Sequence, residues 1–147
     1  MTDDATTDTT GRLIFEVLRL GGRLAAAGDA LVGDLGLSSA RWQVLSTAAF
    51  GPDRLTVSGI ARSLGQARQS VQRVVNELEA AGFVAMQDNP AHQRARLVTP
   101  TDGGRKVLAE AEARRIDWTA SIAQALADTD VAAAEAALIR LRQHLDG

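Results

Sequence analysis

Apolar side chains recur three and four positions apart along most of the chain, which predicts a protein built mainly of helices. The first such stripe spans residues 12–32, and its members are Leu13, Val17, Leu20 and Leu24. Gly21 and Gly22 interrupt this stripe, where they would permit either a close contact with another helix or a kink.

A second helix is predicted to begin at Ser38 or Ser39, whose hydroxyl groups can cap its first turn. We expect this helix to end at Gly51 and Pro52, because proline cannot continue a helix. Its apolar residues are Trp42, Val44, Leu45 and Ala48.

Two short helices then follow each other closely in the middle of the chain. Thr56 can cap the first, and Gly65 ends it; its stripe consists of Val57, Ile60, Ala61 and Leu64. The second runs to Gly82, and its stripe consists of Val71, Val74, Val75 and Leu78. Two helices joined by so short a link are typical of a helix-turn-helix, whose second helix enters the major groove of DNA.

The hydrophobic period changes after Gly82. Residues 83–87 read as a strand, and residues 88–93 read as a turn or loop. From Arg94 to Val98 basic and apolar residues alternate, which predicts a return strand with Arg94 and Arg96 on one face. The pattern therefore predicts a β-hairpin with a basic return strand.

Two helices are predicted after the hairpin. Thr101 opens a long one, and the segment from Asp128 to Asp130 breaks it and caps the last one. The last helix keeps the 3-4-3-4 spacing of a helix that seeks a partner, with Val131, Ala134, Leu138, Leu141 and Leu145. The predicted fold class is thus mainly α with a small β-hairpin.

Length and composition fit one compact domain. The chain has 147 residues, of which 46% are hydrophobic. Residues 1–10 are acidic and rich in threonine, so we expect a disordered tail there and a single domain over residues 11–147.

The charge is unevenly distributed. The whole chain carries a formal charge of −2, but the segment from Arg54 to Lys106 holds eight basic and four acidic residues, a net charge of +4. A basic middle between acidic ends indicates one surface that faces an anionic partner.

The second helix of the pair has a polar face that can read bases. Gln69, Gln72, Arg73 and Asn76 have helical spacing, with Arg68 alongside, and no acid appears before Glu77. Glutamine and asparagine match the edge of adenine, and arginine matches that of guanine. A merely solvated polar face is the alternative, although such faces usually mix acids with bases.

The hairpin offers a second contact with double-stranded DNA. Arginine in a basic loop is drawn to the negative potential of the minor groove. Arg94 is the favoured candidate, supported by Arg96 and His92; the alternative for each is a solvated loop or strand residue.

Other classes of function find little support in the sequence. The absence of cysteine excludes disulfides, thiolate zinc sites and thiol-based oxidation sensing. With His92 and His144 isolated, we expect no metal site, and the chain has no nucleophile motif or phosphate loop, so we expect no cofactor and no catalytic residue. No secretory or membrane segment is visible, and the expected compartment is the cytoplasm.

The segments predicted as the helix-turn-helix and the hairpin resemble those of the MarR family of winged helix-turn-helix transcriptional regulators. The resemblance covers residues 12–145 and rests on four runs: Leu55 to Gly65, Arg68 to Arg73, Leu78 to Val84 and Leu97 to Gly104. It implies a DNA-binding lobe over residues 38–100 and dimerisation helices over residues 11–33 and 101–146. The DNA-binding residues it implies are Arg68, Gln69, Ser70, Gln72, Arg73, Asn76, His92, Arg94 and Arg96.

The sequence departs from the family pattern at two places. His92, Gln93 and Arg94 stand where the family wing commonly reads aspartate-x-arginine-arginine, so the aspartate that braces the wing is missing. Ala67 stands where the recognition helix often begins with serine or threonine, and loss of that cap costs about 1 kcal/mol.

The resemblance also implies a homodimer that binds two half-sites and responds to a small ligand. Physical reasoning favours dimer contacts by the first and last helices, with burial inside one chain as the alternative. The residues expected at the dimer contact are Ile14, Leu18, Leu138, Leu141 and Leu145.

A small aromatic or anionic effector is implied in a cleft between the dimerisation helices and the DNA-binding lobe, which Arg41 and Trp42 could line. The alternative is that Trp42 belongs to the core and Arg41 to the surface. For the protein as a whole, the sequence thus predicts a ligand-responsive repressor on a pseudo-palindromic operator. The competing interpretation is a winged-helix module that binds an acidic protein and no DNA.

Overall fold

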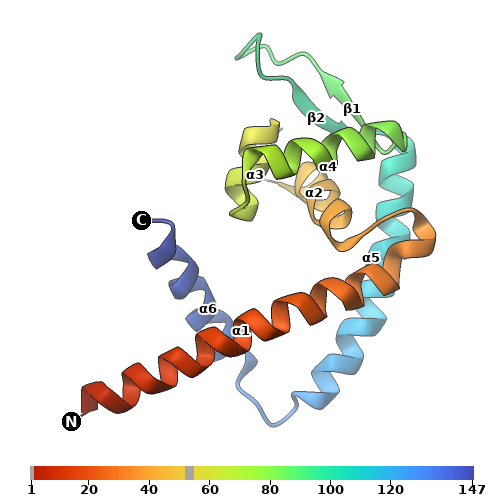
Figure 1. The fold of residues 1–147 in the computed structure, drawn as a ribbon. Coiled ribbons are helices and arrows are strands. Elements are labelled where there is room, and N and C mark those ends of the chain that lie inside the picture. The colour runs from red at the N-terminus through yellow and green to blue at the C-terminus, as the bar shows by residue number, and fades with distance from the viewer. Residues whose placement is uncertain (1, 52–54) are drawn as a thin grey trace.

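The computed structural model describes the backbone of residues 2–51 and 55–147. Within these residues the chain forms six α-helices, one 3-10 turn and a two-stranded antiparallel sheet (Figure 1). In chain order the elements are α1 (Thr2–Val32), η1 (Gly33–Leu35), α2 (Ser39–Phe50), α3 (Val57–Leu64), α4 (Arg68–Ala80), β1 (Val84–Gln87), β2 (Leu97–Pro100), α5 (Asp102–Ala125) and α6 (Val131–Leu145). The mainly helical fold with a small hairpin is as the sequence predicts.

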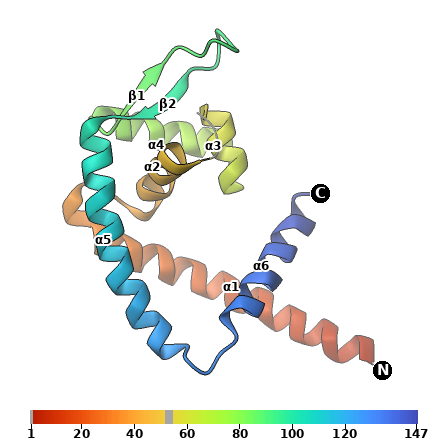
Figure 2. The same cartoon turned by 180° about the vertical axis from the view of Figure 1, so that it is seen from behind.

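The elements form two parts (Figure 2). Helices α2, α3 and α4 pack together with the sheet into one lobe, and the hairpin projects from it as a wing. Helix α5 leaves this lobe and leads to α6, while α1 forms a second long arm that diverges from α5. Helix α4 and the wing lie at the end of the molecule opposite the connection between α5 and α6.

One hydrophobic core holds the lobe together. The apolar stripe of α4 is buried, and none of its residues is more than 4% exposed; they are Val71, Val74, Val75 and Leu78. It packs against buried side chains of the neighbouring helices, including Leu45 of α2 and Ile60 of α3. Truncation of such a leucine or isoleucine to alanine typically costs about 2–5 kcal/mol, so this core fixes how α4 is rotated.

The predicted helix caps are confirmed. The Ser38 hydroxyl accepts a hydrogen bond from the Arg41 amide at 3.2 Å, and Thr56 Oγ1 accepts one from the Gly59 amide at 3.1 Å. Thr101 and Asp130 likewise cap α5 and α6 at 3.0 Å each. Helix α2 ends at Phe50 with Gly51 as its C-cap, and Pro52 lies outside the described residues.

The link between α3 and α4 is as short as the sequence predicts. Gly65 has a φ of +62°, the left-handed conformation that glycine adopts readily, and it ends α3. Ala67 precedes α4 and provides no side-chain cap, so the departure noted in the sequence leaves this helix start without a hydroxyl partner.

The return strand begins later than predicted. Strand β2 starts at Leu97, paired with Gln87, so Arg94 and Arg96 lie in the loop of the wing. The predicted return strand is therefore correct at Leu97 and Val98 and wrong at residues 94–96. The pairing starts where Leu97 and Val98 become buried in the core. The Val98 amide also donates a hydrogen bond of 2.9 Å to the carbonyl of Leu55, which belongs to a third segment, the one before α3.

The acidic segment at the N-terminus is helical from Thr2 onward, where the sequence analysis expects a disordered tail over residues 1–10. Asp8 pairs with Arg12 one turn later, and Arg12 also donates to Thr9 Oγ1 at 3.0 Å. Acidic residues near a helix N-terminus are favoured by the helix dipole. Met1 lies outside the described residues.

Helix α1 continues through Gly21 and Gly22 as one element. A Cβ atom added at either glycine would meet no atom within 4 Å, so within the described chain neither glycine serves a close helix contact.

Candidate nucleic-acid interface

The rotation of α4 leaves its polar face open to solvent. Because the opposite stripe is buried, Gln69, Arg73 and Asn76 are exposed and Gln72 is half-buried. Arg68 and Ser70 in the first turn are exposed as well. No acidic residue lies in the first turn of α4, and the first acid along this helix is Glu77. The residues predicted to read bases therefore share one accessible surface.

Two amides of this face are bonded to each other. Gln72 Nε2 donates to Asn76 Oδ1 at 2.9 Å, one helical turn apart. Each amide keeps free donor or acceptor atoms in this arrangement, and the bond restricts the rotamers of both. The pair is thus partly ordered before any base is bound.

The wing is braced by Arg96. Its guanidinium donates to the Met86 carbonyl at 2.8 Å and lies 3.9 Å from the Asp88 carboxylate. At the tip, Asn89 Oδ1 accepts from the Ala91 amide at 3.0 Å and closes a turn. Arg96 therefore ties the two sides of the wing together in a chain that lacks the bracing aspartate of the family pattern.

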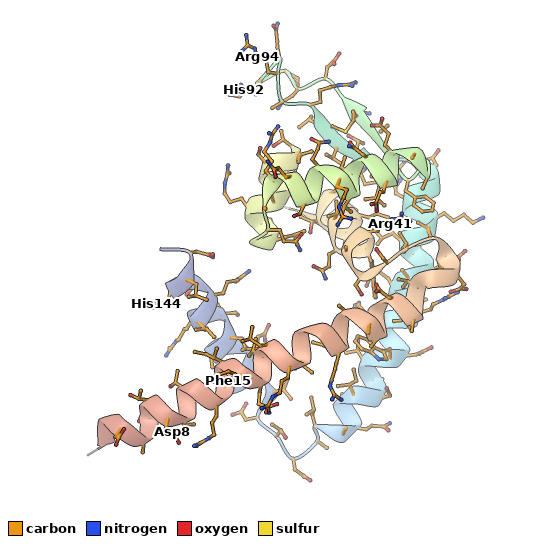
Figure 3. The ribbon with its side chains drawn as sticks, viewed as in Figure 1. Asp8, Phe15, Arg41, His92, Arg94 and His144 are labelled. Carbon is orange, nitrogen blue, oxygen red and sulfur yellow. The ribbon has the colours of Figure 1, made fainter. Side chains whose placement is uncertain are left out.

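Arg94 and His92 lie at the outer end of the wing. Both are exposed, and Figure 3 shows them beyond the paired strands of the hairpin. An arginine in this place has no ion pair among the described residues, so its charge is available to a partner.

Arginines of α4 and of the wing meet at one cleft. The cleft holds about 190 Å³ and lies between the start of α3, the start of α4 and the wing. Arg68, Arg94 and Arg96 line it together with Gln72 and Thr56. The charge of three arginines around one cleft favours the approach of phosphate.

Arg41 and Trp42 diverge, although they are neighbours in the sequence. Arg41 Nε donates to Glu77 Oε2 of α4 at 3.0 Å, and its NH1 donates to the Gly36 carbonyl at 3.2 Å. Figure 3 places Arg41 between α2 and α4. Arg41 is therefore not a lining residue of the cavity described next, where the sequence analysis expects it, because successive residues of a helix point about 100° apart.

Trp42 does line a cavity, and the second tryptophan of the protein joins it there. The cavity holds about 380 Å³ between α1, α2 and α5, and Trp42 and Trp118 are among its walls together with Glu112 and Arg115. Arg115 Nε donates to Glu112 Oε2 at 2.7 Å. Trp118 and Arg115 were not predicted from the sequence as cavity residues, because periodicity places them on α5 without indicating which helix they face.

The residues expected at a dimer contact are accessible in the single chain. Leu18 is 69% exposed and Leu145 is 75% exposed, and Ile14 and Leu138 are about 40% exposed. Leu141 is half-buried, and α6 as a whole has no buried residue.

Within the described residues, no group of histidine, cysteine, aspartate and glutamate side chains could hold a metal ion. None of the helices in residues 2–51 and 55–147 is both long and apolar enough to cross a membrane.

Comparison with known sequences gives a consistent picture. A sequence model of the MarR family matches residues 35–95. An uncharacterized protein of Mycobacterium tuberculosis is 38% identical over 137 residues, which are 92% of each chain. The transcriptional activatory protein BadR of Rhodopseudomonas palustris is 32% identical over 109 residues, or 71% of this chain and 61% of BadR.

Solved structures share the fold over nearly the whole chain. A MarR-family transcription regulator, SP03579, superposes with a TM-score of 0.80 at 18% identity and covers 99% of this chain and 96% of its own. MepR of S. aureus, solved in complex with DNA, has a TM-score of 0.78 at 14% identity over 89% and 96% of the two chains. CouR of Rhodococcus jostii, solved with bound p-coumaroyl-CoA, has a TM-score of 0.65 at 23% identity over 90% and 88%.

Proposed function

Because the chain belongs to the MarR family of winged-helix transcriptional regulators, we propose that it binds a pseudo-palindromic operator as a homodimer and releases it when a small ligand binds. Proteins of this family are DNA-binding regulators and not enzymes. The observation that carries the proposal is the exposed polar face of α4, where Gln69, Arg73 and Asn76 stand before any acid. The alternative interpretation, a module that binds protein only, has no comparable support.

The proposal assigns different tasks to α4 and to the wing. Gln69, Gln72, Arg73 and Asn76 read base edges in the major groove. Arg68 and Ser70, in the first turn, contact phosphate, which positions the protein without reading sequence. The residues of the wing that reach the minor groove or its phosphates are Arg94, Arg96 and His92.

The homodimer is proposed from the apolar faces that the single chain leaves open. Leu18 of α1 and Leu145 of α6 are more than two-thirds exposed, and a lone chain would have to keep this surface in water. Burial inside one chain, the competing interpretation, finds no support in α6, which has no buried residue. We therefore assign Ile14, Leu18, Leu138, Leu141 and Leu145 to contacts with a second copy.

Ligand control is proposed at the cavity between Trp42 and Trp118. It opens between the α1 and α5 arms and the lobe that carries α4. A small aromatic or anionic effector fits its indole walls and Arg115. A ligand that fits only one arrangement of arms and lobe shifts the population toward it, and thus changes the spacing of the two α4 helices.

Repression is the proposed direction of control, because a dimer that covers a promoter blocks polymerase. BadR is named as an activatory protein, so the direction needs its own assay. Transcription in vitro from a bound promoter, with and without the protein, decides it: reduced transcript supports repression, and increased transcript contradicts it.

The experiment that tests the DNA-binding proposal is selection of genomic fragments by the purified protein. We expect enrichment of a pseudo-palindrome whose half-sites lie about 10 base pairs apart, centre to centre. With Arg68, Arg94 and Arg96 in both copies facing about six phosphates, the log–log salt slope is expected near −5. No enrichment at low salt, or a shallow slope, would favour a protein-binding module instead.

A further inference from the structure

Glu77, on α4, lies next to two arginines with different tasks. Its Oε2 accepts from Arg41 Nε at 3.0 Å, and its Oε1 lies 3.9 Å from NH1 of Arg73. Arg73 belongs to the base-reading face, whereas Arg41 belongs to α2. The Glu77 carboxylate thus contacts both Arg41, which reaches α4 from α2, and Arg73, the side chain expected to read a base.

The two contacts differ in strength. Arg41 holds Glu77 firmly, because the Arg41 guanidinium is also bonded to the Gly36 carbonyl at 3.2 Å and its side chain is only 33% exposed. The side chain of Arg73 is 75% exposed and approaches Glu77 only at the limit of an ion pair. Glu77 therefore has a fixed position, while Arg73 keeps the freedom to reach DNA.

The contact between Glu77 and Arg73 runs along the axis of α4. Glu77 follows Arg73 by four residues, so the two side chains neighbour each other on one face of α4. Attraction by Glu77 is weak at this distance and favours, without fixing, rotamers that place the Arg73 guanidinium along the helix axis. Without it, a long exposed arginine samples many rotamers and can turn to the nearest phosphate, which carries no sequence information.

We propose that Glu77, anchored by Arg41, is a positioning residue that holds Arg73 in the orientation needed to discriminate a base pair. This inference rests on the proposed function, since it takes Arg73 to be a base reader. It also gives Arg41 a role in specificity at the interface with α4, in place of the expected role in the ligand cavity. Glu77 carries a negative charge near DNA, so it lowers affinity for all sequences while it raises the preference for the right one.

The test compares E77Q with E79Q. Glu79 lies on the same helix, is exposed, and makes no ion pair among the described residues, so E79Q removes the same charge without touching Arg73. Affinities are measured for the selected operator duplex and for duplexes with each base pair replaced in turn. Both variants are expected to bind all duplexes more tightly, because a negative charge is gone.

Only E77Q is expected to lose discrimination, by about fivefold or more at a single base pair per half-site, the lower end of what a bidentate arginine contact provides. In an R73A background, E77Q is expected to cause no further loss at that pair. R41Q leaves the sequence of α4 unchanged but removes the partner that anchors Glu77. It is expected to reduce discrimination at the same base pair as E77Q does. If E77Q does not fold, as judged by circular dichroism, R41Q carries the comparison.

The two possible failures, of Arg73 as a base reader and of Glu77 as a positioning residue, give different results. If R73A changes the preference at no base pair, Arg73 is not a base reader and the proposed reading of DNA is wrong at that residue. If R73A does relax one pair but the profile of E77Q matches that of E79Q, Glu77 has no positioning role and the inference is overturned.

Discussion

Arg114 on α5 and Asp34 in η1, eighty positions apart, form a two-pronged ion pair, with NH2 to Oδ2 at 2.8 Å. The same guanidinium donates to the Leu31 carbonyl at the end of α1 at 2.9 Å. Arg114 thus ties α5 to the end of α1 and to η1, just before the lobe begins at α2. Any change in the angle between α1 and α5 has to move this contact.

The pair makes a prediction about acid stability. The hydrogen bond from Arg114 holds the pKa of Asp34 below its ordinary value. A carboxyl group with a lowered pKa contributes stability above its unfolded-state pKa and loses it as the pH falls through the folded-state pKa. Asp34→Asn is therefore expected to lower Tm slightly at pH 7, with the difference from the natural protein shrinking below about pH 4. The effect is small because the pair is exposed.

Thermal melts of both proteins between pH 7 and pH 3 measure this difference. Asp117→Asn, on α5 and without an ion pair among the described residues, is the matched control and is expected to show no such trend. A difference between Asp34→Asn and the natural protein that grew toward acid pH would contradict the assignment.

Arg73 and Arg94 are expected to fail in different ways when truncated to alanine. Arg73→Ala should cost about 1–3 kcal/mol at one base pair per half-site and relax the preference there. Arg94→Ala should weaken binding evenly across sequences and reduce the salt slope by about 1 per copy. Fluorescence anisotropy over a series of salt concentrations and duplexes separates the two. Arg12→Ala, on α1 outside the lobe, controls for loss of a positive charge.

The apolar face of α6 is expected to hold the dimer. Leu145→Glu places a charge where the single chain leaves the leucine 75% exposed, so the fold of one chain is not burdened by it. We expect the mass in sedimentation equilibrium to fall from two copies toward one copy of 15.5 kDa. Phe50→Glu, at a similarly exposed apolar position on α2, is expected to leave the mass unchanged. An unchanged mass for Leu145→Glu would remove α6 from the interface.

Tryptophan emission is expected to report on the cavity directly. The protein has two tryptophans and no tyrosine, and both tryptophans line the cavity. Titration with a small aromatic acid such as p-coumarate is expected to change the emission and to weaken operator binding over the same concentrations. Trp118→Phe should reduce the change in emission. Release of DNA with no change in emission would place the effector elsewhere.

Much of the fold follows from local pattern. The stripe from Val71 to Leu78 determined both that α4 is a helix and which of its faces stays in solvent, because an amphipathic helix buries its apolar side. Ser38, Thr56, Thr101 and Asp130 marked the helix starts correctly, since capping needs only neighbours in sequence.

The wing shows where local pattern stops. Alternation from Arg94 onward resembled a strand, but the position where β2 begins depends on partners in other segments, Gln87 and Leu55. The side chain of Arg96 turned out to brace the wing through Met86, a contact that no periodicity contains. Similarly, the polar and acidic pattern of residues 1–10 did not predict that α1 begins as early as Thr2.

The sequence by itself determined the helix-turn-helix, its exposed polar face and the basic hairpin, because these depend on residues within a few turns of one another. Only the tertiary structure decided that Trp118 meets Trp42 in one cavity and that Arg41 turns away from it to Glu77. The physical reason is that periodicity fixes which side of a helix is buried but not what it is buried against. That choice is made by the packing of helices distant in sequence, through contacts that no single segment encodes.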